Sequence, residues 1–178
     1  MIIQSKKAEE QAVLNVAYAV CAAARTAPKA CGIDHMDTAV LTGEDKTRVA
    51  GEMRRIGEGF GEKGVFFIRD ADNVDTSEAV VLVGVKYQPR GLNERCGLCG
   101  FADCPSCEAA GAVCVFTPLD LGIALGSAVS LAADSRVDNR IMFTIGKAAA
   151  SLGLLEEYKL IIGIPLSVSG KSPFFDRG

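Results

Sequence analysis

The chain has 178 residues, of which 49% are hydrophobic and 23% charged, and its formal net charge is −3. This composition is ordinary for a soluble globular protein, and the length suits one domain with its own core. Lys and Arg are scattered along the sequence rather than gathered in a stripe. We therefore expect no nucleic-acid partner, because binding to a phosphate backbone needs clustered cations.

The N-terminal third predicts two helices with a strand between them. Apolar residues recur at helical spacing from Ser5 to Arg25. Pro28 ends this helix, because proline disfavours helical backbone in the residue before it. A strand is expected at 37–42, and the acidic pair after Gly43 favours a second helix that runs to about residue 59.

The rest of the chain predicts more strands and two further helices. The β-branched, apolar runs 65–68 and 79–85 are typical of strands, and the charged segment between them is expected to be a loop. Helices at about 119–134 and 138–152, the second with Asp138 as its N-cap, precede a last strand at 160–168. The apolar stretch before residue 134 contains Pro118 and Asp120, which favours a buried helix over a membrane span.

This order of elements neither alternates strictly nor segregates helices from strands. We therefore expect a single α+β domain over residues 1–178, in which helices cover a mixed sheet and a cysteine-rich loop is inserted at about 94–116. The N-terminus becomes charged too early for a secretory signal. A cytoplasmic protein is expected, and its thiols would stay reduced.

Five of the seven cysteines lie within nineteen residues, in a C-x2-C-x4-C-x2-C run with a fifth thiol behind it. A peptide this short brings its thiols together, and in a reducing compartment they bind a soft metal centre rather than pair as disulfides. Iron–sulfur clusters take four thiolates from tightly curled loops, and the glycines after the first two cysteines suit such curls. The predicted cluster ligands are Cys96, Cys99, Cys104 and either Cys107 or Cys114.

Zinc is the alternative metal for the same thiols. Structural zinc sites also use C-x2-C pairs, but the two pairs usually lie roughly 12 to 20 residues apart, so that each forms its own turn. Four residues separate the pairs here, which favours the iron–sulfur cluster. Zinc would instead imply a metal-stabilised structural or interaction module.

The cysteine block 96–104, the segments 111–116 and 120–128, and the tail 163–177 together resemble the uncharacterised ferredoxin-domain-containing proteins of anaerobic prokaryotes. The resemblance covers nearly the whole chain. It implies a [4Fe–4S] cluster and no assigned substrate. In the pattern of that family, the last cysteine of the block is the one that recurs more consistently, which favours Cys114 as the fourth ligand. We therefore expect an electron-transfer protein or redox enzyme subunit that works with a redox partner protein or a small-molecule electron donor or acceptor.

A second resemblance is to the flavin-dependent nitroreductases. The segment 22–31 is similar to the loop after the first helix of that family, and a Gly-x-Pro step in the last strand is similar too. The resemblance implies a nitroreductase-like fold, a homodimer and, as an alternative function, an FMN-dependent oxidoreductase. The chain departs from the family where paired N-terminal arginines would hold the FMN phosphate, since residues 4–7 are Gln-Ser-Lys-Lys. The flavin-loop residues implied are Arg25, Pro28, Lys29 and Cys31.

Overall fold

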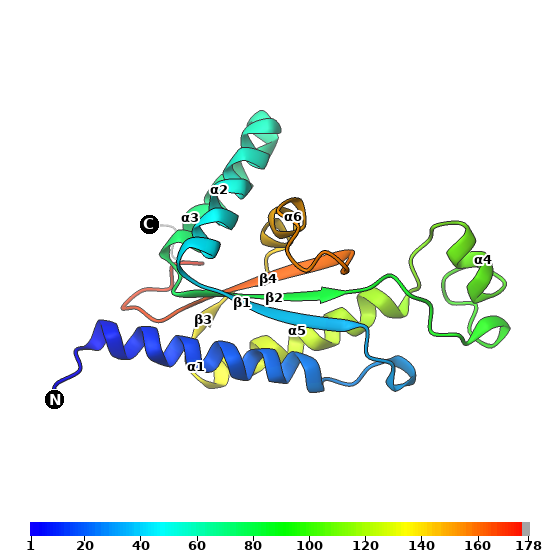
Figure 1. The fold of residues 1–178 in the computed structure, drawn as a ribbon, viewed down its shortest axis with the longest axis horizontal. Helices are drawn as coiled ribbons and strands as arrows, with labels where there is room; N and C mark the ends of the chain where they lie inside the picture. Colours follow the sequence, from blue (N-terminus) through cyan, green and yellow to red (C-terminus); the bar gives the residue numbers. More distant parts are fainter. Residues whose placement is uncertain (176–178) are drawn as a thin grey trace.

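A four-stranded sheet with helices on both faces forms the body of the protein (Figure 1). The structure is a computed structural model that describes residues 1–175, so the last residues of the tail motif at 163–177 lie outside the described part. The α+β class is confirmed, and where the sequence predicts a mixed sheet, every strand pair that the structure describes is antiparallel. The strands stand in the order β1 (Met36–Leu41), β2 (Ala79–Val85), β4 (Leu160–Ser167) and β3 (Asp138–Asn139).

Two layers of helices enclose this sheet. Helices α1 (Ser5–Thr26) and α5 (Phe116–Asp134) lie on one face, and α2 (Gly43–Gly59), α3 (Val65–Thr76) and α6 (Phe143–Ser151) lie on the other (Figure 1). Each layer closes its own hydrophobic core against the sheet. The predicted helices at 5–25, 44–59 and 119–134 and the predicted strands at 37–42, 79–85 and 160–168 are confirmed to within a few residues.

Strand β2 is the centre of the molecule, since all seven of its residues are buried. Successive residues of a strand point to opposite faces of the sheet. Val81 and Val83 accordingly belong to the core beneath α1 and α5, whereas Val80 and Leu82 belong to the core beneath α2, α3 and α6. Burial on both faces explains why the sequence of this strand is apolar throughout.

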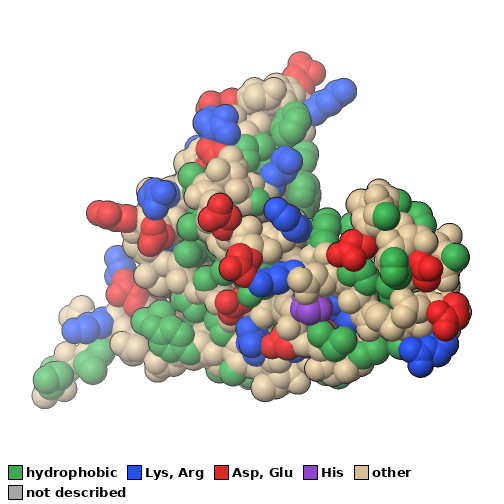
Figure 2. Space-filling view, turned by 45° about the vertical axis from the view of Figure 1, so that its right-hand side comes forward, with side chains coloured by type: hydrophobic (Ala, Val, Ile, Leu, Met, Phe, Trp, Pro, Cys, Tyr) green, Lys and Arg blue, Asp and Glu red, His purple; other side chains and the backbone are tan. Residues whose placement is uncertain are grey.

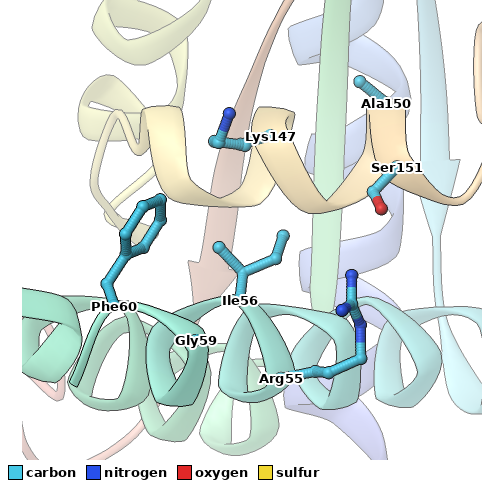
Figure 3. A pocket seen from close by; sticks show the side chains of 7 residues that line it. All are labelled: Arg55, Ile56, Gly59, Phe60, Lys147, Ala150 and Ser151. Atoms are coloured by element: carbon cyan, nitrogen blue, oxygen red, sulfur yellow. The ribbon is translucent and has the colours of Figure 1, made fainter.

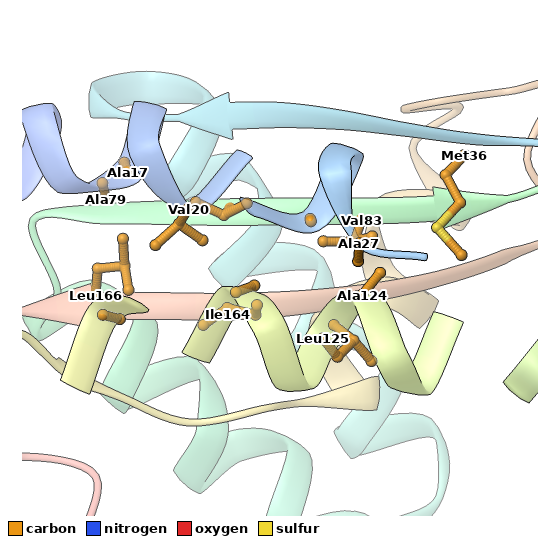
Figure 4. Close-up of a cluster of buried hydrophobic side chains, with 14 of the residues drawn as sticks. Ala17, Val20, Ala27, Met36, Ala79, Val83, Ala124, Leu125, Ile164 and Leu166 are labelled. Atoms are coloured by element: carbon orange, nitrogen blue, oxygen red, sulfur yellow. The ribbon is translucent and has the colours of Figure 1, made fainter. Parts of the chain in front are cut away.

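Small side chains bring α1 and α5 close together over the sheet. Ala17 of α1 is buried in one cluster with Ala124 of α5 (Figure 4), and Ala128 of α5 belongs to the same cluster. The Ser127 hydroxyl of α5 donates a hydrogen bond of 3.0 Å to the Ala23 carbonyl of α1. Among the described helices, α5 is the one long and apolar enough to cross a membrane by length and composition. One of its faces packs into the core described above.

The segment 65–78 is wrongly predicted as a strand followed by a loop, because its residues Val65–Thr76 form helix α3. Its buried residues Phe67, Asp70, Ala71 and Val74 follow a helical spacing, and this face packs against α2 and α6. The aromatic and β-branched residues at 65–68 suggest a strand when they are read alone. Tertiary packing of the helical face outweighs that local preference.

The predicted helix at 138–152 is also corrected, because α6 begins only at Phe143. Asp138 does not cap a helix: it begins the short edge strand β3, which pairs with β4, and its Oδ2 accepts a hydrogen bond of 2.6 Å from the Ser172 hydroxyl. Helix α6 then packs directly on β4. A Cβ atom added at Gly146 would lie 1.6 Å from the Ile161 carbonyl oxygen, so only glycine permits this close approach.

Candidate metal centre

Strand β2 leads into the cysteine loop, which we define as residues 94–116. The loop extends beyond one end of the sheet, to the right in Figure 1, before it returns the chain to α5. Two short elements order the segment: a 3-10 turn, η3 (Asn93–Arg95), and helix α4 (Cys104–Ala109), which lie against each other. The predicted cysteine-rich insertion is therefore present as a folded loop between β2 and α5.

Four of the five clustered cysteines line one cavity inside the loop. The cavity is narrow, with a volume of about 10 Å³, which is roughly the room that one water molecule needs. Apolar side chains at positions 92, 101, 115 and 116 complete much of the wall, and of the lining cysteines Cys114 is buried while the other three are partly exposed. Such a donor set and setting suit a soft metal centre. The four cysteines are Cys96, Cys99, Cys104 and Cys114.

The backbone of the loop curls as a cluster-binding segment requires. Gly97 and Gly100 have φ angles of 63° and 82°, in the left-handed region that favours glycine. The Asn93 amide donates to the Cys104 Sγ atom at 3.4 Å, and amide donors of this kind stabilise a thiolate. Asp103 caps α4, since its Oδ1 accepts a bond of 2.8 Å from the Ser106 amide. The hydrogen bonds from Ser106 lower the pKa of Asp103.

Cys107 lies in the same loop but outside the lining of the cavity. It is buried, and its thiol donates to the Ala112 carbonyl at 3.7 Å. Burial, together with the neighbouring Cys99, raises the pKa of the Cys107 thiol. In the part of the chain that the structure describes, no three His, Cys, Asp or Glu side chains are grouped as ligands of a single metal ion. Cys107 also interacts with Cys99, Cys104 and Cys114, so the choice between Cys107 and Cys114 as the fourth ligand stays a prediction.

A buried ion pair between Arg90 and Asp120 lies beside this cavity. The two side chains are 1% and 2% exposed, and Arg90 also lines the cavity. Its Nη2 and Nε atoms donate to Asp120 Oδ2 at 2.8 and 3.2 Å, and its Nη1 atom donates to the Gln88 carbonyl at 2.8 Å. Asp120 Oδ1 accepts a bond of 3.0 Å from the Ala30 amide. The pair thus joins the entry to the cysteine loop, the first turns of α5 and the loop after α1.

Sequence reasoning missed this pair. The signal was a single acidic residue, Asp120, inside an apolar stretch, because a buried carboxylate needs a cationic or hydrogen-bonding partner. Arg90 lies 30 positions away in a polar segment that also contains Lys86 and Arg95. Nothing in the spacing distinguishes it from these neighbours.

The predicted flavin-loop residues lie together at the end of α1. The two cations among them bind neighbouring groups of the chain. Arg25 donates to the Met36 carbonyl at 2.6 Å and pairs with Asp34 and Asp37 at 2.7 and 3.3 Å. The Lys29 ammonium donates to the backbone carbonyls of residues 25 and 27 at 2.5 and 3.0 Å. Both cations are thus engaged with groups of the chain itself, and the assignment of this loop to FMN stays a prediction.

The two other members of that loop carry no charge. Pro28 is exposed and follows the last turn of α1. Cys31 is exposed as well, in a short 3-10 turn, η1 (Ala30–Gly32), where its φ angle of 57° is left-handed. The loop is therefore a short, braced connection that Ala30 ties to α5.

An open hollow of about 470 Å³ lies away from the cysteine loop, between α2 and α6 (Figure 3). Two cations, Arg55 and Lys147, line it together with Phe60. Arg55 is bound to Glu52, through contacts of 2.6 and 2.7 Å. The clustered thiols lie at the other site, in the cysteine loop. Figure 2 shows the outer surface of that end of the molecule, where acidic and hydrophobic side chains are interspersed.

Comparison with protein families links the chain to an uncharacterised group. A family model (DUF2148) described as "uncharacterized protein containing a ferredoxin domain" matches residues 110–177, a stretch that includes Cys114. Over 185 residues the chain is 40% identical to an uncharacterized protein of Archaeoglobus fulgidus. That match covers 99% of this chain and 98% of the relative, so the two proteins correspond from end to end.

Comparison with solved structures concerns the fold. A nitroreductase with bound FMN from Desulfitobacterium hafniense DCB-2 superposes with a TM-score of 0.59 at 13% identity, over 96% of this chain and 81% of that one. A nitroreductase family protein from Clostridium novyi NT superposes with a TM-score of 0.57 at 13% identity, over 94% and 76%. The predicted nitroreductase-like fold is therefore confirmed, with the cysteine loop as an insertion in it.

Proposed function

The chain belongs to the family of uncharacterized proteins that contain a ferredoxin domain, and on this premise we propose that it binds one [4Fe–4S] cluster and transfers electrons. The observation that carries the proposal is the cavity lined by Cys96, Cys99, Cys104 and Cys114. In this proposal the protein is cytoplasmic. It exchanges electrons with a redox partner protein or with a small-molecule donor or acceptor.

The residues of the loop have three tasks in this proposal. The four thiolates hold the cluster, which supplies one-electron chemistry when it is bound. The amide of Asn93 and the positive-φ glycines orient the backbone around Cys104 and its neighbours. The apolar side chains of Phe101 and Phe116 restrict water around the sulfur atoms, and solvent exposure is one of the properties that set a cluster potential.

Metal and flavin analysis after anaerobic purification tests the proposal. We expect roughly four iron and four sulfide per chain, and a colour that dithionite bleaches. A protein with about one zinc per chain and no sulfide would instead be a zinc-stabilised structural or interaction module. Such a result would end the iron–sulfur proposal.

Serine variants test the ligand set. We expect Cys114→Ser, like serine at positions 96, 99 and 104, to lose most of its iron, because a hydroxyl is a poor substitute for a thiolate on iron. Cys107→Ser and the exposed control Cys31→Ser should retain iron. If Cys107→Ser loses iron and Cys114→Ser keeps it, Cys107 is the fourth ligand.

The second candidate function is an FMN-dependent oxidoreductase. The nitroreductase-like fold favours it, since the D. hafniense structure contains FMN. The engaged side chains of Arg25 and Lys29 count against it. Titration with FMN, followed by flavin fluorescence, distinguishes the two functions. Saturable binding together with oxidation of a nicotinamide would support the flavoenzyme, and a lack of flavin affinity would exclude it.

We further propose that the protein is a homodimer, as the resemblance to nitroreductases implies. The outer face of α5 supports this proposal, because Leu119 and Ile123 expose 52% and 41% of their surface there. Apolar side chains that are grouped on a helix surface suit an interface between subunits. Light scattering should give twice the chain mass of 18.7 kDa. A monomer at micromolar concentration would refute the dimer.

A further inference from the structure

We propose that the buried Arg90–Asp120 ion pair sets the reduction potential of the cluster, with Arg90 as the cation that raises it. The inference rests on the proposed function, because it needs a cluster in the cavity. It assigns to the two residues a role beyond holding the fold. Arg90 lines the cavity together with the four thiols, and Asp120 is its carboxylate partner.

Burial gives this cation a strong effect on its surroundings. The Arg90 side chain is 1% exposed, so little water or salt screens its charge. Charges in a protein interior interact several times more strongly than charges in bulk water at the same separation. A cation in the wall of the cavity therefore acts strongly on any charge that develops inside it.

The pair is placed asymmetrically with respect to the cavity. Among the described residues that line it, Arg90 is the cation, whereas Asp120 is not one of them. Within the pair, Arg90 is therefore the residue that borders the cavity. Four thiolates make a cluster complex negative, and reduction adds one more negative charge. A neighbouring cation stabilises that reduced state, which corresponds to a higher reduction potential.

The other charges near the loop cannot replace Arg90. Asp103 lines the cavity, but it is partly exposed and its carboxylate accepts a hydrogen bond from the Ser106 amide, where it caps α4. Glu94 and Arg95 are exposed, so solvent and salt screen them. Arg90 and Asp120 are the fully buried charged residues of this region, within the part of the chain that the structure describes.

Stability alone is a weak reason for such a pair. Desolvation of two charges costs about as much as their attraction gains, and apolar residues of similar volume often stabilise a core as well. The geometry here is nevertheless elaborate: three Arg90 donors and both Asp120 oxygens are used. The arrangement fixes the guanidinium of a residue that borders the cavity, as a potential-setting charge requires.

Redox titration of the iron-loaded full chain, followed by electron paramagnetic resonance, tests the inference. Arg90→Gln should lower the potential and Asp120→Asn should raise it, each by at least a tenfold change in the equilibrium constant for one-electron reduction, or about 59 mV. The double variant should return close to the wild-type value. Arg95→Gln removes the same charge from an exposed position of the same segment and should change the constant less than twofold.

Opposite shifts of the two single variants are the diagnostic result, because a purely structural role would move both potentials in the same direction or neither. Equal potentials in iron-loaded variants would overturn this inference and leave the proposed function intact. A wild-type protein without iron would overturn both. If Arg90→Gln fails to load iron, Asp120→Asn decides alone, since asparagine keeps an oxygen that accepts from the Ala30 amide. A raised potential then supports the inference and an unchanged one refutes it.

Discussion

Two buried threonines illustrate how much one hydroxyl group matters in this protein. Thr117 and Thr144 both have 0% exposed surface. The Thr144 hydroxyl donates to Asp70 Oδ2 at 2.9 Å, whereas Thr117 Oγ1 is a buried atom for which no partner exists among the described residues. A buried hydroxyl without a partner loses its hydration and gains nothing in return. The two positions should therefore respond in opposite ways to the same substitution.

The test of this contrast is Thr→Val at each position. Thr117→Val should increase the free energy of unfolding of the metal-free protein by about 1 kcal/mol, because it removes an unsatisfied group at nearly constant volume. Thr144→Val should decrease it by about 1–3 kcal/mol, because it leaves the buried Asp70 carboxylate short of a donor. Urea denaturation under reducing, anaerobic conditions measures both. A destabilised Thr117→Val protein would mean that this hydroxyl has a partner.

Residue types were a good guide to the thiols and a poor guide to their surroundings. The spacing from Cys96 to Cys114 predicted the cysteine loop, because four soft ligands in a short peptide have few other uses. The ion pair between Arg90 and Asp120 could not be predicted, because the two side chains meet only after β2 and α5 have packed together. Residues that act on a site from a distant part of the chain leave no local pattern.

At the level of elements, Glu52 joins α2 to α6. Its carboxylate accepts hydrogen bonds from Arg55 within α2 and from the Ser151 hydroxyl at the end of α6, the latter at 2.5 Å. The bonds from Arg55, and next those from Ser151, lower the pKa of Glu52 from its ordinary value of 4.5 to about 2. The contact between the two helices should therefore weaken as the pH falls.

The sign of this dependence follows from the lowered pKa. A carboxylate whose pKa is lower in the folded state stabilises the protein above its unfolded pKa of 4.5, and this contribution is lost as the pH falls toward 2. Between pH 6 and pH 3, wild-type protein should lose more stability than Glu52→Gln. Chemical denaturation at several pH values provides the comparison. Parallel curves for the two proteins would contradict the role of Glu52.

Elements with a single clear periodicity were the ones predicted correctly. Helix α1 has apolar residues at helical spacing, and β2 is a continuous apolar run, so both were recognised. Helix α3 was missed because its first residues favour a strand and its polar face looked like a loop. Strand β3 has only two residues and depends on its pairing with β4, so no local signal for it exists.

For the molecule as a whole, the cysteine loop differs from the sheet in how it is held. Strand β2 is hydrogen-bonded on both sides, to β1 and to β4. The loop has mainly short-range backbone bonds, such as those from Cys96 to Asn93 and from Gly100 to Gly97. Its order should therefore depend on the metal, as small cysteine-rich segments commonly do.

Removal of the metal should affect the loop and leave the sheet unchanged. We expect amides in 94–116 to exchange with deuterium much faster in metal-free protein than in iron-loaded protein, and amides of β2 to stay protected in both. Hydrogen exchange followed by mass spectrometry provides the measurement. Equal protection of the loop in the two forms would show that the loop is ordered without the cluster.

The pairing of β2 with β4 has a consequence for synthesis on the ribosome. The cysteines are made before β4, and about 50 residues separate Cys114 from Ser167 at the end of that strand. At typical elongation rates of about 5–20 residues per second, this interval lasts about 3–10 s. During that time the nascent polypeptide carries all of its thiols while the central strand lacks one of its two neighbours. The predicted cluster ligands are therefore synthesised before the sheet that supports their loop is complete.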